Sequence, residues 1–245
     1  MKRVKLVVAY DGTNYCGWQI QPKEITVEQV LNQTLSQLLG EEIVVIGASR
    51  TDSGVHALGN VAVFDTNTRI PSEKISYALN QRLPEDIKIQ HSMDVPDDFH
   101  PRHCNCTKTY EYKILNCAHR IPTYRMDTHF VYQSLDINAM QEAANHLVGE
   151  YDFKSFCSIH TQVKETVRTI YSIDILKQEP VIMIRIRGNG FLYNMVRIIA
   201  GTLIQVGQGV IKPDQFVSIR EAKDRSQAGP TAPAKGLTLV DIQYE

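Results

Sequence analysis

Residues 26–40 read TVEQVLNQTLSQLLG, and this stretch predicts an amphipathic helix with a marked start and a marked end. Thr26 and Gln29 stand in the register of a capping box, which satisfies free N–H groups of the first helical turn. Gly40 is the residue type that most often follows a last turn. Between them, apolar side chains recur at the spacing of one helix face. The valine-rich segment Lys2–Tyr10 precedes this helix and predicts a strand.

The elements that follow complete a known order in the first half of the chain. We expect strands at residues 43–47 and 60–66, a helix between Pro71 and Pro84, and a strand at residues 87–93. The order β-α-β-β-α-β is that of the ferredoxin-like split motif.

The second half predicts the same order again. Its expected elements are strands at 107–116 and 129–133, a helix at 137–148, a hairpin at 166–176 and 180–187, an apolar helix at 191–206, a short helix at 213–222 and a strand at Leu237–Tyr244. We therefore predict an α+β fold of two ferredoxin-like halves, residues 1–98 and residues 99–245. Together the halves form an extended antiparallel sheet with helices on one side.

The overall composition excludes several classes of protein. The chain has 26 Lys and Arg residues and 27 Asp and Glu residues, and the net charge of −1 excludes binding of nucleic acid through bulk positive charge. Apolar residues at 43% and charged residues at 22% are ordinary for a globular chain. The sequence lacks the apolar run of a signal peptide and the longer run of a membrane span. We therefore expect a soluble, cytoplasmic protein with no membrane contact.

Cysteine usage argues against a disulfide scaffold and against a metal site. The count of five is odd. The one close pair, Cys104 and Cys106, lacks the two-residue spacer that is typical of zinc ligands. The eight histidines form no metal-binding pair, so we expect no metal.

A polar loop at residues 47–57, GASRTDSGVHA, is the first candidate for a functional site. It places Arg50, Thr51, Asp52 and His56 within seven positions, between two expected strands. Long ordered loops are often functional. The alternative interpretation is a polar hairpin loop in which Asp52 caps a turn.

Arg197 is the only charged residue of the apolar helix expected at residues 191–206. On a helical wheel it shares a stripe with Tyr193, and a helix that is apolar on both sides is expected to be buried on both. A buried arginine needs a carboxylate partner, and breaking such a pair costs about 3–5 kcal/mol. Asp52 is the best candidate, and this pairing would hold it ionised. The alternative places Arg197 at the boundary between helix and solvent.

Residues 99–125 interleave basic and aromatic side chains. Five basic residues and one acidic residue, Glu111, give this segment a net charge of +4. The combination suits phosphate contact together with base stacking. The alternative is a strand whose tyrosines pack in the core while its charges face water. Arg185, Arg187 and Arg197 add three further positive charges, so we expect a basic trough on a molecule with an acidic back.

Five blocks of the sequence resemble the tRNA pseudouridine synthase A family, and together they cover nearly the whole chain. The blocks are YDGTNYCGWQIQP, SRTDSGVHALGNVAVFDT, FHPRHCNCTKTYEYKI, GNGFLYNMVRIIAGTL and TAPAKGLTLVDIQY. The resemblance implies one catalytic carboxylate and three residues that support it. The carboxylate is Asp52; the others are Arg197, which pairs with it, Tyr110, an active-site tyrosine, and Leu237, which packs against the target base.

The resemblance also implies an activity, a fold and partners. The activity is that of an isomerase, an intramolecular transferase that converts uridine to pseudouridine at positions 38, 39 and 40 of the tRNA anticodon stem-loop. The fold is the pseudouridine synthase fold, in which the N-terminal half carries the aspartate loop and the C-terminal half completes the active-site cleft. We expect a homodimer without metal or organic cofactor. The expected RNA contacts are Arg50, Arg102, Lys108 and His56.

The implied chemistry leaves alternatives open. The carboxylate of Asp52 can attack C1′ of the sugar or act as a base at the 2′ carbon. Tyr110 either stacks on the uracil or also removes the C5 proton. Ser49 and Ser53 depart from the family, which often has glycine and alanine at these places. The competing interpretation is a non-catalytic RNA-binding module, which has no need of a carboxylate against its RNA.

Overall fold

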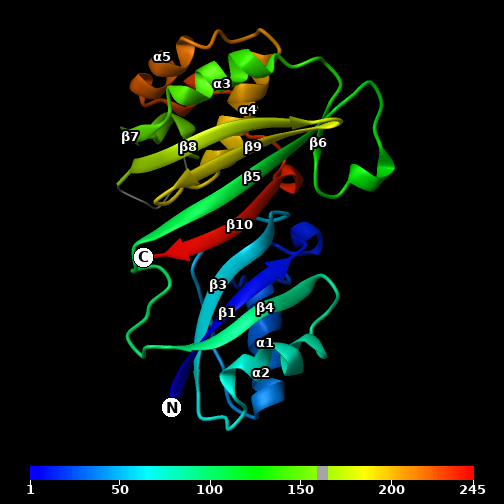
Figure 1. Cartoon of the computed structure of the whole chain (residues 1–245), viewed down its shortest axis with the longest axis vertical. Helices are drawn as coiled ribbons and strands as arrows, with labels where there is room; N and C mark the ends of the chain where they lie inside the picture. The colour runs from blue at the N-terminus through cyan, green and yellow to red at the C-terminus, as the bar shows by residue number, and fades with distance from the viewer. Residues whose placement is uncertain (159–164) are drawn as a thin grey trace. The chain divides into compact units, whose positions relative to one another are not determined.

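The computed structural model describes residues 1–158 and 165–245, which divide into two compact units (Figure 1). The first unit comprises Met1–Asn105 together with Leu239–Glu245, and the second comprises Cys106–Thr238. Both units mix helices with mostly antiparallel strands, so the α+β class is confirmed. The division into domains at residues 98 and 99 stays a prediction.

The first unit is a small sheet with two helices. Its elements are β1 (Lys2–Tyr10), α1 (Val27–Leu39), β2 (Ile46–Gly47), β3 (His56–Thr66), α2 (Ser72–Asn80), β4 (Ile87–Val95) and most of β10 (Leu237–Tyr244). The strand order is β4-β1-β3-β10, with β2 beside β3. β1 runs antiparallel to both β3 and β4. α1 and α2 lie on one face of this sheet (Figure 1).

Local sequence signals explain how this unit forms. Thr26 Oγ1 accepts a hydrogen bond from the N–H of Gln29 at 3.4 Å, and Gly40 ends α1 with a left-handed φ of 66°. Every second residue of β1 from Val4 to Tyr10 is buried, as the two-residue period of a strand requires. The core of the first unit lies between this face of the sheet and α1.

The second unit contains further strands and three helices. Its elements are β5 (Cys106–Asn116), β6 (His129–Val131), α3 (Ile137–Asn145), β7 (Gly149–Asp152), β8 (Val167–Gln178), β9 (Val181–Gly188), α4 (Met195–Gly207) and α5 (Gln215–Ala222). The strand order is β5-β9-β8-β7 with antiparallel neighbours, and β6 lies parallel to β5. α3, α4 and α5 lie on one face (Figure 1). None of the helices in the described part of the chain reaches the length and apolarity of a membrane span.

The apolar helix begins later than the sequence predicts. α4 starts at Met195 because Asn194, its N-cap, has a left-handed φ of 60°, which a right-handed helix does not contain. Tyr193 therefore lies before the helix and is exposed, and the expected stripe shared by Tyr193 and Arg197 is wrong. The expected burial on both sides is confirmed, because Arg197 and Gln205 are the only two of the 13 residues of α4 that are not buried.

The boundaries of several other elements also differ from those predicted. β3 begins at His56, four residues before the expected start, so His56 belongs to a strand and the loop before it is shorter. β2 is only two residues long. α3 ends at Asn145, three residues before the end of the helix predicted at residues 137–148. β1 and β10 have the predicted bounds.

An ion pair joins neighbouring strands of the first unit and generates a prediction about pH. Arg3 of β1 donates two hydrogen bonds of 2.8 Å to the carboxylate of Asp65 on β3. These hydrogen bonds, with the charge of Arg3, hold the pKa of Asp65 below its ordinary value. A carboxyl whose pKa is lower in the folded state adds stability above its unfolded pKa, and that stability disappears as the pH falls through the folded pKa.

We therefore expect Asp65→Asn to lower the free energy of unfolding by about 1 kcal/mol or less at pH 7, since the pair is partly exposed. The difference from the parent protein should shrink as the pH falls below about 4. Urea unfolding at several pH values measures it. Glu85→Gln, which removes an exposed carboxylate of the same unit, is the control. A difference that stays constant down to pH 2 would contradict the assignment.

Candidate active site

The loop between β2 and β3 carries Asp52 and is held by the segment that follows β1. The backbone N–H of Trp18 donates to the carbonyl of Thr51 at 3.0 Å, and the N–H of Gly54 donates to the carbonyl of Tyr15 at 3.3 Å. The N–H of Val55 donates to the carbonyl of Asp52 itself at 3.1 Å. We call residues 11–18 the clamp segment, because these bonds fix the loop on both sides of Asp52.

Gly17 makes this clamp sterically possible. Its φ is +79°, and a Cβ atom there would lie 2.6 Å from the carbonyl oxygen of Thr51. A side chain at this position would be strained and would push the loop away. Trp18 follows it and is fully buried. Sequence reasoning missed the clamp role of Tyr15, Gly17 and Trp18; the signal was a glycine-containing block that holds the only tryptophan of the chain.

Asp52 is half-buried, whereas Arg50 is exposed two residues earlier. The loop thus keeps Thr51 inside the unit and directs Arg50 toward solvent. A carboxylate on a fixed, partly shielded loop is suited to act on a substrate bound at the surface.

Arg102 reaches this loop from the segment after β4. Its Nε donates to the carbonyl of Gly47 at 2.7 Å. Burial lowers the pKa of Arg102, and the nearby charge of Arg50 lowers it further. Two guanidinium groups thus lie near each other beside the Asp52 loop, which is an arrangement suited to binding phosphate.

His56 lies inside the first unit, at the start of β3, and is buried. Its Nδ1 is 3.1 Å from the N–H of Gly12 and 3.0 Å from Oδ1 of Asp11. One nitrogen cannot accept from Gly12 and donate to Asp11 in the same protonation state. Partial burial acts to raise the pKa of Asp11, but hydrogen bonds from Thr13 and the His56 ring hold it below its ordinary value. Contact between His56 and RNA stays a prediction.

In the second unit, Arg197 lies on the first turn of α4 and is half-buried. Its Nε donates to the carbonyl of Ala232 at 2.8 Å, and its Nη1 donates to Oδ1 of Asn194 at 2.7 Å. The N–H of Ala232 returns a bond to the carbonyl of Arg197 at 3.1 Å. These partners orient the guanidinium without neutralising its charge.

The segment before β10 lies directly against α4 and β5. A Cβ atom on Gly201 would collide with the carbonyl oxygen of Pro230, so the glycine permits this close approach. Tyr112 is fully buried and donates from its hydroxyl to the carbonyl of Pro233 at 2.9 Å, and burial raises the pKa of that hydroxyl. These contacts fix the chain that leads into Leu237, which is itself buried.

Tyr110 and Lys108 lie on β5. The Tyr110 ring is nearly buried and meets Phe191 edge to face, with centroids 5.2 Å apart. Lys108 is half-buried and lies opposite Gly188 of β9. Tyr112, two residues further on, is also buried, so the alternative that the tyrosines of this strand pack in the core is borne out for both residues.

Some of the basic residues that the sequence analysis counts toward the basic trough form ion pairs in the structure. Arg185 donates two hydrogen bonds of 2.8 and 2.6 Å to Glu111 on the neighbouring strand. Lys113 lies 3.3 Å from Asp127. Arg187 is exposed on β9. Glu111 is already subtracted in the sum of +4, whereas Asp127 lies outside that segment, so of these two pairs only that of Lys113 and Asp127 makes the local positive charge smaller than the sum indicates.

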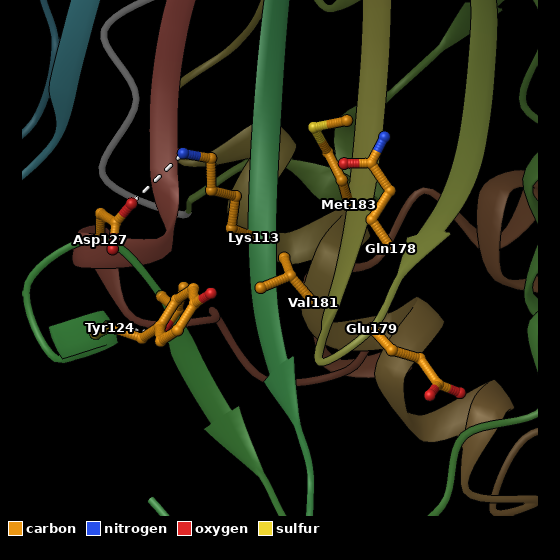
Figure 2. A pocket seen from close by; sticks show the side chains of 8 residues that line it. Lys113, Tyr124, Asp127, Gln178, Glu179, Val181 and Met183 are labelled. Carbon is orange, nitrogen blue, oxygen red and sulfur yellow. Dashed lines mark hydrogen bonds and ion pairs between the residues drawn. The ribbon is translucent and has the colours of Figure 1, made fainter. Parts of the chain in front are cut away.

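The second unit also contains an open pocket of about 340 Å³ that is separate from these residues (Figure 2). Tyr124, Val181 and Met183 line it together with the ion pair of Lys113 and Asp127. None of the predicted site residues lines this pocket. Among the described residues, no three His, Cys, Asp or Glu side chains gather as metal ligands.

The close packing at Gly201 generates a prediction. Alanine normally stabilises a helix by about 1 kcal/mol relative to glycine. Here the added methyl group meets backbone, so we expect Gly201→Ala to destabilise the protein by about 1–3 kcal/mol. Thermal unfolding measures the change. The comparison is Gly40→Ala, where the added methyl group has open space and only the left-handed φ opposes it. A Gly201→Ala protein more stable than the parent would contradict the contact.

Comparisons with known proteins agree with the motifs. The family described as tRNA pseudouridine synthase matches residues 6–103 and 143–245. The tRNA pseudouridine synthase A of Thermoanaerobacter sp. (strain X514) is 49% identical over 244 residues, and that of Ruminiclostridium cellulolyticum is 48% identical over 245 residues. Both alignments cover 100% of this chain and of the relative.

One solved structure is a much weaker match. A chain from the crystal structure of a Cbf5-Nop10-Gar1 complex gives a TM-score of 0.35 at 14% identity, with 83% of this chain and 53% of that chain covered. A likeness this weak carries no conclusion about the fold. The family match spans most of the chain, and relatives of the same length are nearly half identical to it. The chain therefore belongs to the tRNA pseudouridine synthase family of isomerases.

Proposed function

We propose that this chain isomerises uridine to pseudouridine at positions 38, 39 and 40 of the tRNA anticodon stem-loop, with Asp52 as the catalytic carboxylate. The observation that carries the proposal is the place of Asp52. It is half-buried in a loop whose backbone is bonded on both sides to the clamp segment. The full-length relatives named tRNA pseudouridine synthase A support the substrate class.

The reaction exchanges one bond of uridine for another. The N1–C1′ bond breaks, the uracil turns, C5 bonds to C1′, and the C5 proton leaves while N1 gains a proton. Asp52 either attacks C1′ or acts as a base at the 2′ carbon. Either role requires the ionised carboxylate.

Arg197 is the proposed partner of that carboxylate. A positive charge within about 4–6 Å favours the ionised form of an acid. The guanidinium is oriented by Ala232 and Asn194, both through neutral oxygens. An ion pair with Asp52 would place this oriented charge against the reacting group.

Tyr110 and Leu237 are proposed to meet the target base. Tyr110 is held on β5 by its edge contact with Phe191, so its ring is a rigid surface for stacking, and its hydroxyl is the candidate acceptor of the C5 proton. Leu237 follows a segment tied down by Tyr112 and supplies an apolar contact. The uridine must leave its stack to reach such a site.

The proposed RNA contacts follow the basic residues near the loop. Arg50 and Arg102 offer guanidinium groups to phosphate, and Lys108 and His56 are the further contacts predicted. Modest local charge suits binding by shape more than by bulk attraction. We also propose that each unit is a ferredoxin-like half, that the enzyme is a cytoplasmic homodimer, and that catalysis needs no cofactor.

Asp52→Asn keeps the size of the side chain and removes its charge, so we expect it to abolish pseudouridine formation. The Kd for tRNA should stay within about threefold, which is less than 1 kcal/mol. Tritium release from tRNA labelled at C5 of uridine measures turnover, and filter binding measures Kd. Asp98→Asn makes the same charge change at an exposed site of the first unit and should retain activity. Normal turnover by Asp52→Asn would remove the catalytic role.

Tyr110→Phe keeps the aromatic ring and removes the hydroxyl. General base catalysis contributes about 10²–10⁴-fold, so we expect a loss of kcat of at least about 10²-fold with little change in KM. Single-turnover tritium release measures it. Tyr132→Phe, the same change at an exposed tyrosine of the second unit, serves as the control. Unchanged kcat for Tyr110→Phe would assign this residue to stacking alone.

A further inference from the structure

A chain of side-chain hydrogen bonds ends at Thr51, the residue before Asp52. The hydroxyls of Tyr10 and Thr51 lie 2.7 Å apart. Nδ2 of Asn60 lies 3.3 Å from the Tyr10 hydroxyl and 3.1 Å from the carbonyl of Ser49, and it donates to both. Oδ1 of Asn60 accepts from the N–H of Val61 at 2.9 Å. We call Tyr10, Thr51 and Asn60 the loop network.

The loop network is shielded from water. Asn60 is fully buried, Tyr10 is 5% exposed and Thr51 is 7% exposed. Polar groups in such surroundings are costly unless they are hydrogen-bonded. Water does not compete for these bonds, so they hold their geometry more firmly than surface bonds do.

These bonds are additional to those that hold the sheet together. Tyr10 and Asn60 belong to β1 and β3, which already pair through a backbone ladder. That ladder has an irregularity between Val8 and Tyr10, and such bulges re-aim a side chain and often lie beside active sites. The side chains of Tyr10 and Asn60 reach Ser49 and Thr51, which belong to the loop and not to the ladder.

We propose that Tyr10 and Asn60 are positioning residues that act on Asp52 through Thr51 and Ser49. Neither residue has to touch the substrate for this role. They tie the loop backbone to the sheet just before Asp52, while the clamp segment holds the carbonyl of Thr51 and the N–H of Gly54. This inference rests on the proposed catalytic role of Asp52.

The test removes single hydroxyls without changing the shape of the core. Tyr10→Phe and Thr51→Val each break the bond between Tyr10 and Thr51. A displacement of about 1 Å in a catalytic group can cost about 10²-fold in rate. We therefore expect each variant to lose between about 10-fold and 10²-fold in kcat, with KM for tRNA within about twofold.

The double variant shows whether the two residues act through one bond. If they do, Tyr10→Phe with Thr51→Val should be no slower than the slower single variant, because the same interaction is lost once. Thr51→Ser keeps the hydroxyl and should restore most of kcat. A merely structural hydroxyl would show neither the non-additive loss nor the rescue in kcat.

Thr66→Val is the matched control for Thr51→Val. Thr66 is a buried threonine at the far end of β3, and its hydroxyl donates to Glu41 at 3.0 Å. The two variants should lose comparable thermal stability, but only Thr51→Val should lose kcat. Single-turnover tritium release, KM and the thermal midpoint are measured for all variants.

The outcomes separate this inference from the proposed function. Equal kcat for Thr51→Val and Thr66→Val, or additive losses in the double variant, would overturn the positioning role while Asp52 remains catalytic. Full turnover by Asp52→Asn would overturn the proposed role of Asp52 and the positioning role with it. Reduced kcat with rescue by Thr51→Ser, in an enzyme that Asp52→Asn inactivates, supports both.

Discussion

The contact between Gly17 and Thr51 is the constraint on which the placement of the Asp52 loop depends. Because Gly17 has no side chain and a left-handed backbone, the clamp segment passes close to the Thr51 carbonyl, and Trp18 can donate its N–H to it. The loop then gains bonds on its other side through Tyr15. A carboxylate carried on such a loop needs little reorganisation when substrate arrives, and preorganisation of this kind is a large part of enzymatic rate enhancement.

In the second unit, close backbone packing and hydrogen bonds orient the side chain of Arg197. The guanidinium of Arg197 is oriented by the carbonyl of Ala232 and the amide oxygen of Asn194. Gly201 lets the segment that contains Ala232 approach the helix. Asn194 both begins α4 with its left-handed backbone and holds Arg197 with its side chain. Asn194 thus determines both where α4 begins and how the guanidinium of Arg197 is oriented.

Local features of the fold could be predicted from the sequence, and distant contacts could not. The cap residues Thr26 and Gly40 and the alternation of β1 act between neighbours, so they are readable in a linear chain. No pattern of apolar residues indicates that Asn194 adopts a left-handed backbone. The start of α4 predicted from the sequence is therefore too early. Within the candidate site, Asp52 and Arg197 stood out by residue type and setting.

The residues that hold the Asp52 loop cannot be recognised from the sequence in this way. Tyr10 reaches Thr51 over 41 positions, and Asn60 reaches Tyr10 over 50. Arg185 and Glu111 are 74 positions apart, which is why a sum of charges over a segment missed their pairing. Only folding brings these groups together.

The return of the chain to the first unit has a consequence for its biosynthesis. Leu239–Glu245 belongs with Met1–Asn105, and Tyr244 attaches it there by donating to the carbonyl of Pro101 at 2.9 Å and by meeting the ring of Phe99. A ribosome makes these residues after all of Cys106–Thr238. The edge of β3 that receives β10 therefore waits uncovered while the second unit is translated, and an uncovered strand edge invites pairing with other chains. The first unit, although its synthesis begins first, therefore completes its strand order only when Leu239–Glu245 is made.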